Sequence, residues 1–216
     1  MKAKLTNKLT GKYLNVQILL NGLNCVVAAY AAIFLKFKGF TNTEIGFILS
    51  IAAILSIIIQ PLIASFADST DKYTLRQISM FIVGLNVIFS FIILLGKEVK
   101  PVIFVFFLLI TAIHGTLSPL TNSLAVEYIN KGIFINYGLA RGLGSLAFAI
   151  FSIIVGYIVG KFNPDLLIIF GLIFYILEIV SIYYFKLKPH HLQYLTRSIK
   201  KSHISADSKL HPMQTE

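Results

Sequence analysis

The chain has 216 residues, a formal net charge of +10 and a mean hydropathy of +0.81, and 56% of its residues are apolar while 13% are charged. This composition excludes an ordinary soluble domain and indicates a protein of the lipid bilayer. The basic residues are spread over loops and the tail without a clustered basic face, so the charge does not indicate a nucleic-acid partner.

Apolar runs long enough to cross a hydrocarbon core of about 30 Å predict an all-α integral membrane protein with six transmembrane helices. The fourth run is interrupted at Gly115 and Pro119, which indicates a kink or a tilt. A cytoplasmic N-terminal segment is expected over 1–12 and a polar tail over 189–216. Within the bundle over 13–188, the predicted spans are Tyr13–Leu35, Glu44–Ala67, Gln77–Gly96, Pro101–Val126, Asn136–Gly160 and Leu166–Phe185.

Helix start and stop signals separate these runs. Thr41 and Glu44 have the T-x-x-E spacing of a capping box, which would satisfy free backbone amides at the start of the second span. Asn163-Pro164-Asp165 breaks the chain before the sixth span. Because the connections are short, we expect consecutive helices to be neighbours.

The distribution of Lys and Arg predicts the orientation, since cytoplasmic loops carry an excess of both. With the N-terminus in the cytoplasm, thirteen of these residues lie on the cytoplasmic side. The other side has only Lys36, Lys38, Lys97, Lys100 and Lys161. We therefore predict a multi-pass protein of the cell membrane with both termini in the cytoplasm.

The sequence contains none of the motifs that mark a metal or nucleotide cofactor. Its single cysteine, Cys25, lies in the first span, so an intramolecular disulfide is excluded. We expect neither a cofactor nor an enzymatic activity.

Polar side chains inside the spans mark the candidate site, because the bilayer core disfavours them unless they face a polar interior. In the first span, Gln17, Asn21 and Asn24 are spaced by four and three residues and share one helix face. The fifth span contains Arg141 and the sixth contains Glu178. The fourth span has His114, Thr116, Ser118, Thr121 and Asn122 around its interruption.

The first and fourth spans hold most of the uncharged polar groups. This pattern is typical of two inverted three-helix repeats whose leading helices line a common cavity near the middle of the bilayer. Small residues spaced by four, as in Gly46–Ser50, Gly138–Gly142 and Gly156–Gly160, favour close helix packing.

Two stretches resemble the major facilitator superfamily of membrane transporters. The run Gln60–Arg76, with Asp68 and Lys72, resembles the superfamily's cytoplasmic loop signature. Ser118–Gly156 is similar to the helix four to helix five region of the lactose permease group, the oligosaccharide and nucleoside proton symporters. The resemblance covers about 12–188 and implies one six-helix half of the superfamily fold.

The resemblance implies roles for individual residues. Arg141 falls on the arginine that binds sugar hydroxyls in that group, and Asn122 falls on its carboxylate partner, here an amide. Phe148 falls on the sugar-stacking tryptophan. With Asn21 and Asn24 these residues form the predicted substrate site, and the resemblance implies proton-coupled symport of a polar, hydroxyl-rich solute. The alternative for the arginine is that its side chain extends to the membrane interface.

Other polar residues have more than one interpretation. Glu178 and His114 are predicted proton-linked groups, with a structural carboxyl and a packed histidine as the alternatives. Asp68 with Lys72 or Arg76 is predicted to hold cytoplasmic helix ends together during gating.

Two other function classes stay open. One is an intramembrane serine hydrolase that would use Ser145 with His114. The other is a non-transporting six-helix partner protein. The length of the chain matches one half of a superfamily transporter, so we expect a second six-helix half or self-association, as a truncated product, a split half or a homodimer. The expected partners are the bilayer and a small solute.

Overall fold

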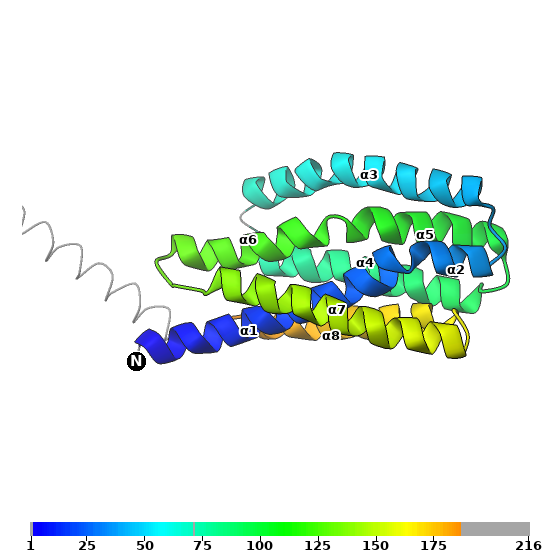
Figure 1. Ribbon diagram of the computed structural model, residues 1–216. Coiled ribbons are helices and arrows are strands. Elements are labelled where there is room, and N and C mark those ends of the chain that lie inside the picture. Colours follow the sequence, from blue (N-terminus) through cyan, green and yellow to red (C-terminus); the bar gives the residue numbers. More distant parts are fainter. Residues whose placement is uncertain (1, 71, 187–216) are drawn as a thin grey trace, which may run out of the picture.

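The computed structural model describes residues 2–70 and 72–186, which form helices lying side by side in one bundle (Figure 1). The predicted tail over 189–216 lies outside these residues. The elements are α1 (Lys2–Leu23), the π-helical turn η1 (Asn24–Ala29), α2 (Ala31–Phe37), α3 (Asn42–Ser69), α4 (Leu75–Leu95), α5 (Lys100–His114), α6 (Leu117–Asn130), α7 (Tyr137–Lys161) and α8 (Leu166–Tyr184).

Five stretches of the described chain are long and apolar enough to cross a membrane: α3, α4, α5 with α6, α7 and α8. Thr6–Ala29 and α2 are bent by 44° relative to each other, and they form a sixth span if they cross together. The span predicted over Tyr13–Leu35 is therefore interrupted at η1. Side-chain hydrogen bonds explain the break, because Asn24 bonds to His114 of α5 and the Tyr30 hydroxyl donates to the Ser152 carbonyl of α7 at 2.7 Å.

The interruption expected in the fourth span is present between α5 and α6. Gly115 stands at this break, where a Cβ atom would overlap Ser56 Oγ of α3. Pro119 lies in the first turn of α6, where its missing N–H costs no helical hydrogen bond. The break therefore coincides with a close contact between α3 and the fourth span.

The capping box predicted at the start of the second span is confirmed. Thr41 Oγ1 accepts from the Glu44 amide at 3.2 Å, and Glu44 Oε2 accepts from the Thr41 amide at 2.7 Å. A second capping box, at Thr74 and Gln77, begins α4. Each box satisfies backbone amides that a helix start leaves free.

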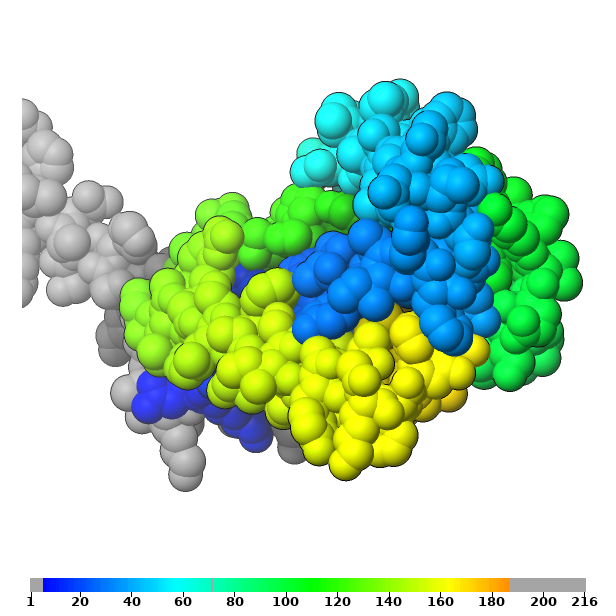
Figure 2. Space-filling view, turned by 45° about the vertical axis from the view of Figure 1, so that its right-hand side comes forward, coloured from blue at the N-terminus to red at the C-terminus, as the bar shows by residue number. Residues whose placement is uncertain are grey.

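The helices pack in a regular pattern. α1 lies against α7 and α8, α5 lies against α3 and α4, and α4 lies against α8. α3 lies at one side of the bundle and stands out from it in the space-filling view (Figures 1 and 2). Large apolar side chains such as Ile57 of α3 and Ile153 of α7 are 71% and 75% exposed, as expected of a surface that faces lipid.

Ion pairs join the connections at the bundle end opposite the N-terminus (Figure 1). Lys38, whose side chain is only 7% exposed, lies 2.6 Å from Asp165 and 3.8 Å from Glu98. Lys100 lies 3.1 Å from Glu44. These contacts connect the α2–α3, α4–α5 and α7–α8 junctions.

Candidate functional site

Three side chains form a hydrogen-bonded cluster between α1 and α6. The Tyr13 hydroxyl donates to Asn122 Oδ1 at 3.1 Å and accepts from Gln17 Nε2 at 2.7 Å. Gln17 Nε2 also lies 3.3 Å from Asn122 Oδ1. Tyr13 and Gln17 are buried while Asn122 is only half-buried, so the cluster opens at Asn122.

The first turns of α7 add an aromatic ring and a cation to this cluster. The Tyr137 ring stacks on Tyr13, with centroids 5.8 Å apart and planes 18° apart. One turn later, Arg141 Nη1 donates to the Tyr137 hydroxyl at 3.3 Å, and its guanidinium carbon lies 5.7 Å from that ring's centroid. Arg141 is exposed, and α7 forms part of the molecular surface in Figure 2.

A glycine brings α1 and α7 together beside the cluster. A Cβ atom at Gly144 would lie 2.6 Å from Asn21 Nδ2 and 3.2 Å from the Gln17 carbonyl oxygen. Asn21 Nδ2 donates to that same carbonyl at 2.8 Å. Asn21 therefore lies in the contact between α1 and α7, and the absence of a side chain at Gly144 makes room for it.

Ser145 and Phe148 follow Arg141 on the same face of α7, by their spacing of four and seven residues. Phe148 is half-buried and packs against the apolar core. Arg141 and Asn122 are not in direct contact; Tyr137 and Tyr13 connect them.

Asn24 belongs to a second chain of hydrogen bonds. Its Oδ1 lies 2.9 Å from His114 Nε2, and His114 Nδ1 lies 3.2 Å from the Tyr175 hydroxyl. Because an amide oxygen only accepts, Nε2 donates to Asn24, while the Tyr175 hydroxyl can donate to Nδ1 or accept from it. This chain links the first, fourth and sixth spans, and Asn24 is bonded to His114 in it.

Two buried polar side chains have no hydrogen-bond partner among the described residues. Glu178 of α8 and Asn86 of α4 are both fully buried, and neither Glu178 oxygen nor either Asn86 amide atom is bonded. A buried carboxyl without a nearby cation is a candidate proton carrier.

The predicted gating residues lie where α3 ends and α4 begins. Asp68 and Lys72 are exposed, and the Lys72 ammonium lies 5.3 Å from the Tyr73 ring centroid. Arg76 is half-buried and its Nε has no partner. In this part of the chain, as far as it is described, no ion pair joins Asp68 to either basic residue.

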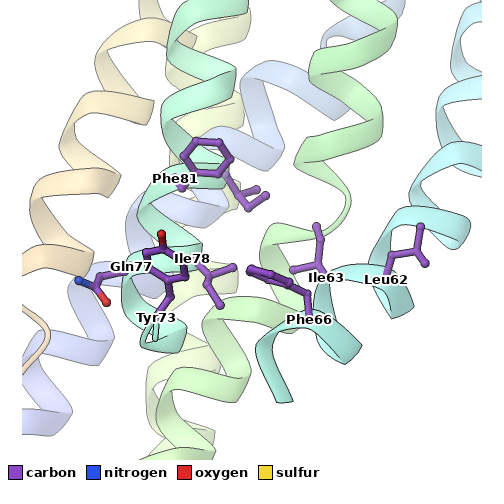
Figure 3. Close-up of a pocket in the computed structure, with 8 residues that line it drawn as sticks. Leu62, Ile63, Phe66, Tyr73, Gln77, Ile78 and Phe81 are labelled. Atoms are coloured by element: carbon purple, nitrogen blue, oxygen red, sulfur yellow. The ribbon is translucent and has the colours of Figure 1, made fainter. Parts of the chain in front are cut away.

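An apolar groove of about 620 Å³ lies beside these residues (Figure 3). It is lined by Leu62, Ile63, Phe66, Tyr73, Gln77, Ile78, Phe81 and Ile82. Its polar groups are one amide and one phenol, which is few for a ligand rich in hydroxyls. The cluster around Arg141 has the better chemistry for a polar ligand.

The alternative Ser–His pair is not formed. Ser145 Oγ donates to the Arg141 carbonyl at 3.2 Å, while both ring nitrogens of His114 are occupied by Asn24 and Tyr175. A serine hydrolase requires the serine and the histidine within hydrogen-bond reach of each other.

Comparison with protein-family models shows which family the chain belongs to. The model described as the MFS_1 like family matches residues 22–211. The chain belongs to this family. Membership in the MFS_1 like family identifies a multi-pass membrane protein of transporter type, in agreement with the apolar helices. The searches of curated proteins and of solved structures gave no match. The narrower resemblance to the lactose permease group stays a prediction.

Tyr13 and Tyr175 take part in these hydrogen bonds but were not predicted as site residues from the sequence. A signal for Tyr13 was available, because the spacing of four residues between Gln17 and Asn21 extends back to it. For Tyr175 the signal is its place three residues before Glu178 on the buried face of α8.

Proposed function

We propose that this chain forms the solute-binding half of a transporter that carries a polar, hydroxyl-rich molecule, such as an oligosaccharide or a nucleoside, together with protons. The single observation that carries the proposal is the cluster of Tyr13, Gln17 and Asn122 with Tyr137 and Arg141 stacked beside it. It combines aromatic faces with amide and guanidinium donors on the predicted spans, and this is the chemistry that sugars and nucleosides require.

In this proposal each predicted site residue has its own role in solute binding. Arg141 and the Asn122 amide donate hydrogen bonds to solute hydroxyls, and Phe148 offers its ring to a sugar face. Asn21 lines the site where α1 meets α7, and Asn24, one turn further along the first span, completes this polar face. The packing supports these roles, because these five residues lie on α1, η1, α6 and α7, and α1 contacts each of the other three elements.

Proton coupling is assigned to the buried groups. Glu178 of α8 is fully buried and has no hydrogen-bond partner among the described residues. His114 of α5 is hydrogen-bonded to Asn24 and to Tyr175, which lies on α8 as Glu178 does. Both therefore lie inside the bundle, where a proton could bind without contact with lipid.

We further propose six spans arranged as two inverted three-helix repeats. The packing pattern supports this arrangement. A two-fold axis would exchange α1 with α5, α3 with α7 and α4 with α8, the leading, second and third helices of the two repeats. This exchange converts the α1–α7 contact into α5–α3, and the α1–α8 contact into α5–α4, and all four contacts are present. The same exchange leaves the α4–α8 contact in place, as an approximate two-fold axis requires.

A second wall is proposed for the site. Arg141 and Ser145 are exposed on α7, and a guanidinium exposed to lipid costs about 2.5–3.5 kcal/mol or more. A second six-helix half or a second copy of the chain would cover this face and enclose the solute.

The proposed orientation in the cell membrane follows from the lysine distribution, with both termini in the cytoplasm. Asp68, Lys72 and Arg76 would then hold the cytoplasmic helix ends during gating.

The test is solute binding to the purified chain in lipid nanodiscs, with lactose and uridine as probes. Arg141→Lys keeps the charge but loses the planar fork, so it should abolish the binding seen with the unaltered chain while membrane insertion is retained. Lys161→Arg, at the far end of α7, is the matched control and should bind normally. Normal binding by the Arg141→Lys protein would mean that Arg141 only anchors α7 at the membrane interface.

A further inference from the structure

Arg141 carries a charge that no acidic side chain of the described chain neutralises. The described acidic residues are Glu44, Asp68, Glu98, Glu127, Asp165 and Glu178. Glu44 pairs with Lys100, Glu98 and Asp165 with Lys38, and Glu127 with Lys131, while Asp68 and Glu178 form no ion pair. The positive charge of the site is therefore uncompensated.

The groups around Arg141 are neutral, and their acceptor atoms are already in use. The Tyr137 hydroxyl accepts one guanidinium hydrogen at 3.3 Å, and the other guanidinium N–H donors have no acceptor among the described residues. Asn122 Oδ1 already accepts from both Tyr13 and Gln17, while Asn122 Nδ2 makes no hydrogen bond within the same part of the chain. The groups left free for a ligand are therefore mainly donors.

A site with free donors and a net positive charge favours a ligand with acceptors and a negative charge. A carboxylate or a phosphate accepts two parallel hydrogen bonds from one guanidinium, and such charge-assisted bonds are roughly twice as strong as neutral ones. A hydroxyl group forms weaker bonds and leaves the charge uncompensated in a region where an unpaired charge is costly.

We propose that the solute is a hydroxylated organic anion whose carboxylate or phosphate binds Arg141. The inference rests on the proposed function and narrows its substrate class from neutral sugars and nucleosides to their acidic derivatives. Arg141 receives the anionic group, the Tyr137 ring keeps the guanidinium in place by cation–π contact, and Asn122 Nδ2 donates to a neighbouring oxygen of the same solute.

The test compares two matched pairs of probes on the full chain in nanodiscs by calorimetry. Lactose and lactobionate differ by a carboxylate, and uridine and uridine monophosphate differ by a phosphate. At least one anion should bind about tenfold to hundredfold more tightly than its neutral partner, as expected for one hydrogen bond to a charged group. The pair that shows the preference tells whether the site takes a carboxylate or a phosphate.

Variants connect this preference to Arg141. Arg141→Gln should lower the affinity for the anionic probe at least to that of its neutral partner, which removes the anion preference. Lys161→Gln removes one charge from the same helix and should keep the preference. Equal binding of neutral and anionic probes to the unaltered chain would overturn the inference and leave the proposed function standing. Binding of none of the four probes would overturn both. An anion preference that survives in Arg141→Gln would also overturn the inference, because another group would then bind the negative charge of the solute.

Discussion

Gly144 shows how one residue determines the distance between two helices at the candidate site. Its hydrogen atom faces α1, and the Asn21 side chain and the Gln17 carbonyl occupy the space that a methyl group would need. Gly142 lies in the same turn of α7, has open space at its Cβ position and therefore has no comparable packing role. Small residues permit such close approach between membrane helices.

This difference predicts opposite effects for two alanine substitutions. Gly144→Ala should destabilise the folded chain by about 1–3 kcal/mol, because the added methyl group forces α1 and α7 apart. Gly142→Ala should stabilise it by about 0.5–1 kcal/mol, since alanine favours a helix over glycine. Thermal unfolding of both variants in detergent measures the difference. Equal melting temperatures would mean that α1 and α7 are not in close contact at this position.

At the scale of elements, the connections at the end opposite the N-terminus depend on Lys38. Its ammonium lies between Asp165, just before α8, and Glu98, just before α5. Because the Lys38 side chain is almost completely buried, its removal leaves Asp165 without its closest partner. The contact therefore holds α2 to the start of the sixth span.

Lys38→Ala should lower the free energy of unfolding by about 1.5–3 kcal/mol, the value of a hydrogen bond to a charged group. Lys97→Ala changes an exposed lysine in the α4–α5 connection that forms no ion pair among the described residues, so its effect should be within about 0.5 kcal/mol. Chemical denaturation of the two variants provides the comparison. A Lys38→Ala protein as stable as the unaltered chain would show that the ion pair contributes nothing.

The helices themselves were largely predictable, because apolar runs and capping signals are local. Thr41 and Glu44 stand three residues apart in the sequence, and their capping box was predicted correctly. The bend at η1 was not predictable in this way, since it depends on contacts between Tyr30 and Ser152 and between Asn24 and His114, which are far apart in the chain.

The same distinction holds for the candidate site. Arg141 and Asn122 were predicted as site residues because polar groups in apolar runs are conspicuous and because of the resemblance to known transporters. The stack of Tyr137 on Tyr13 connects residues of α7 and α1 and has no local signal. Periodicity shows which residues share a helix face, but only the packed bundle shows which faces meet.

At the scale of the whole molecule, both ends of the described chain lie toward the same end of the bundle (Figure 1). The Lys12 ammonium donates to the Lys186 carbonyl at 2.7 Å, so the chain just after α8 lies beside the N-terminal half of α1. An even number of crossings brings both ends to the same side of a membrane. Lysine counts on the two sides favour the cytoplasm for this end.

Reporter fusions test this topology in cells. A reporter that is active only in the cytoplasm should be active after Lys131 and after Met213, and it should be silent after Gly96. The reason is that the α4–α5 connection lies at the opposite end of the bundle from the α6–α7 connection (Figure 1). Activity after Gly96 would contradict the six-span topology.

In the proposed function, the α7 face that carries Arg141 lines an aqueous solute pathway and does not face lipid. Thiol labelling in membrane vesicles open on both sides tests it most directly, after replacement of the single cysteine, Cys25, by alanine. A thiol reacts as the thiolate, which requires water. Ser145→Cys should react rapidly with a membrane-impermeant maleimide, while Ile153→Cys, exposed on the apolar part of the same helix, should stay unlabelled. Labelling of neither cysteine, with both variants inserted in the membrane, would contradict a water-filled site at Arg141.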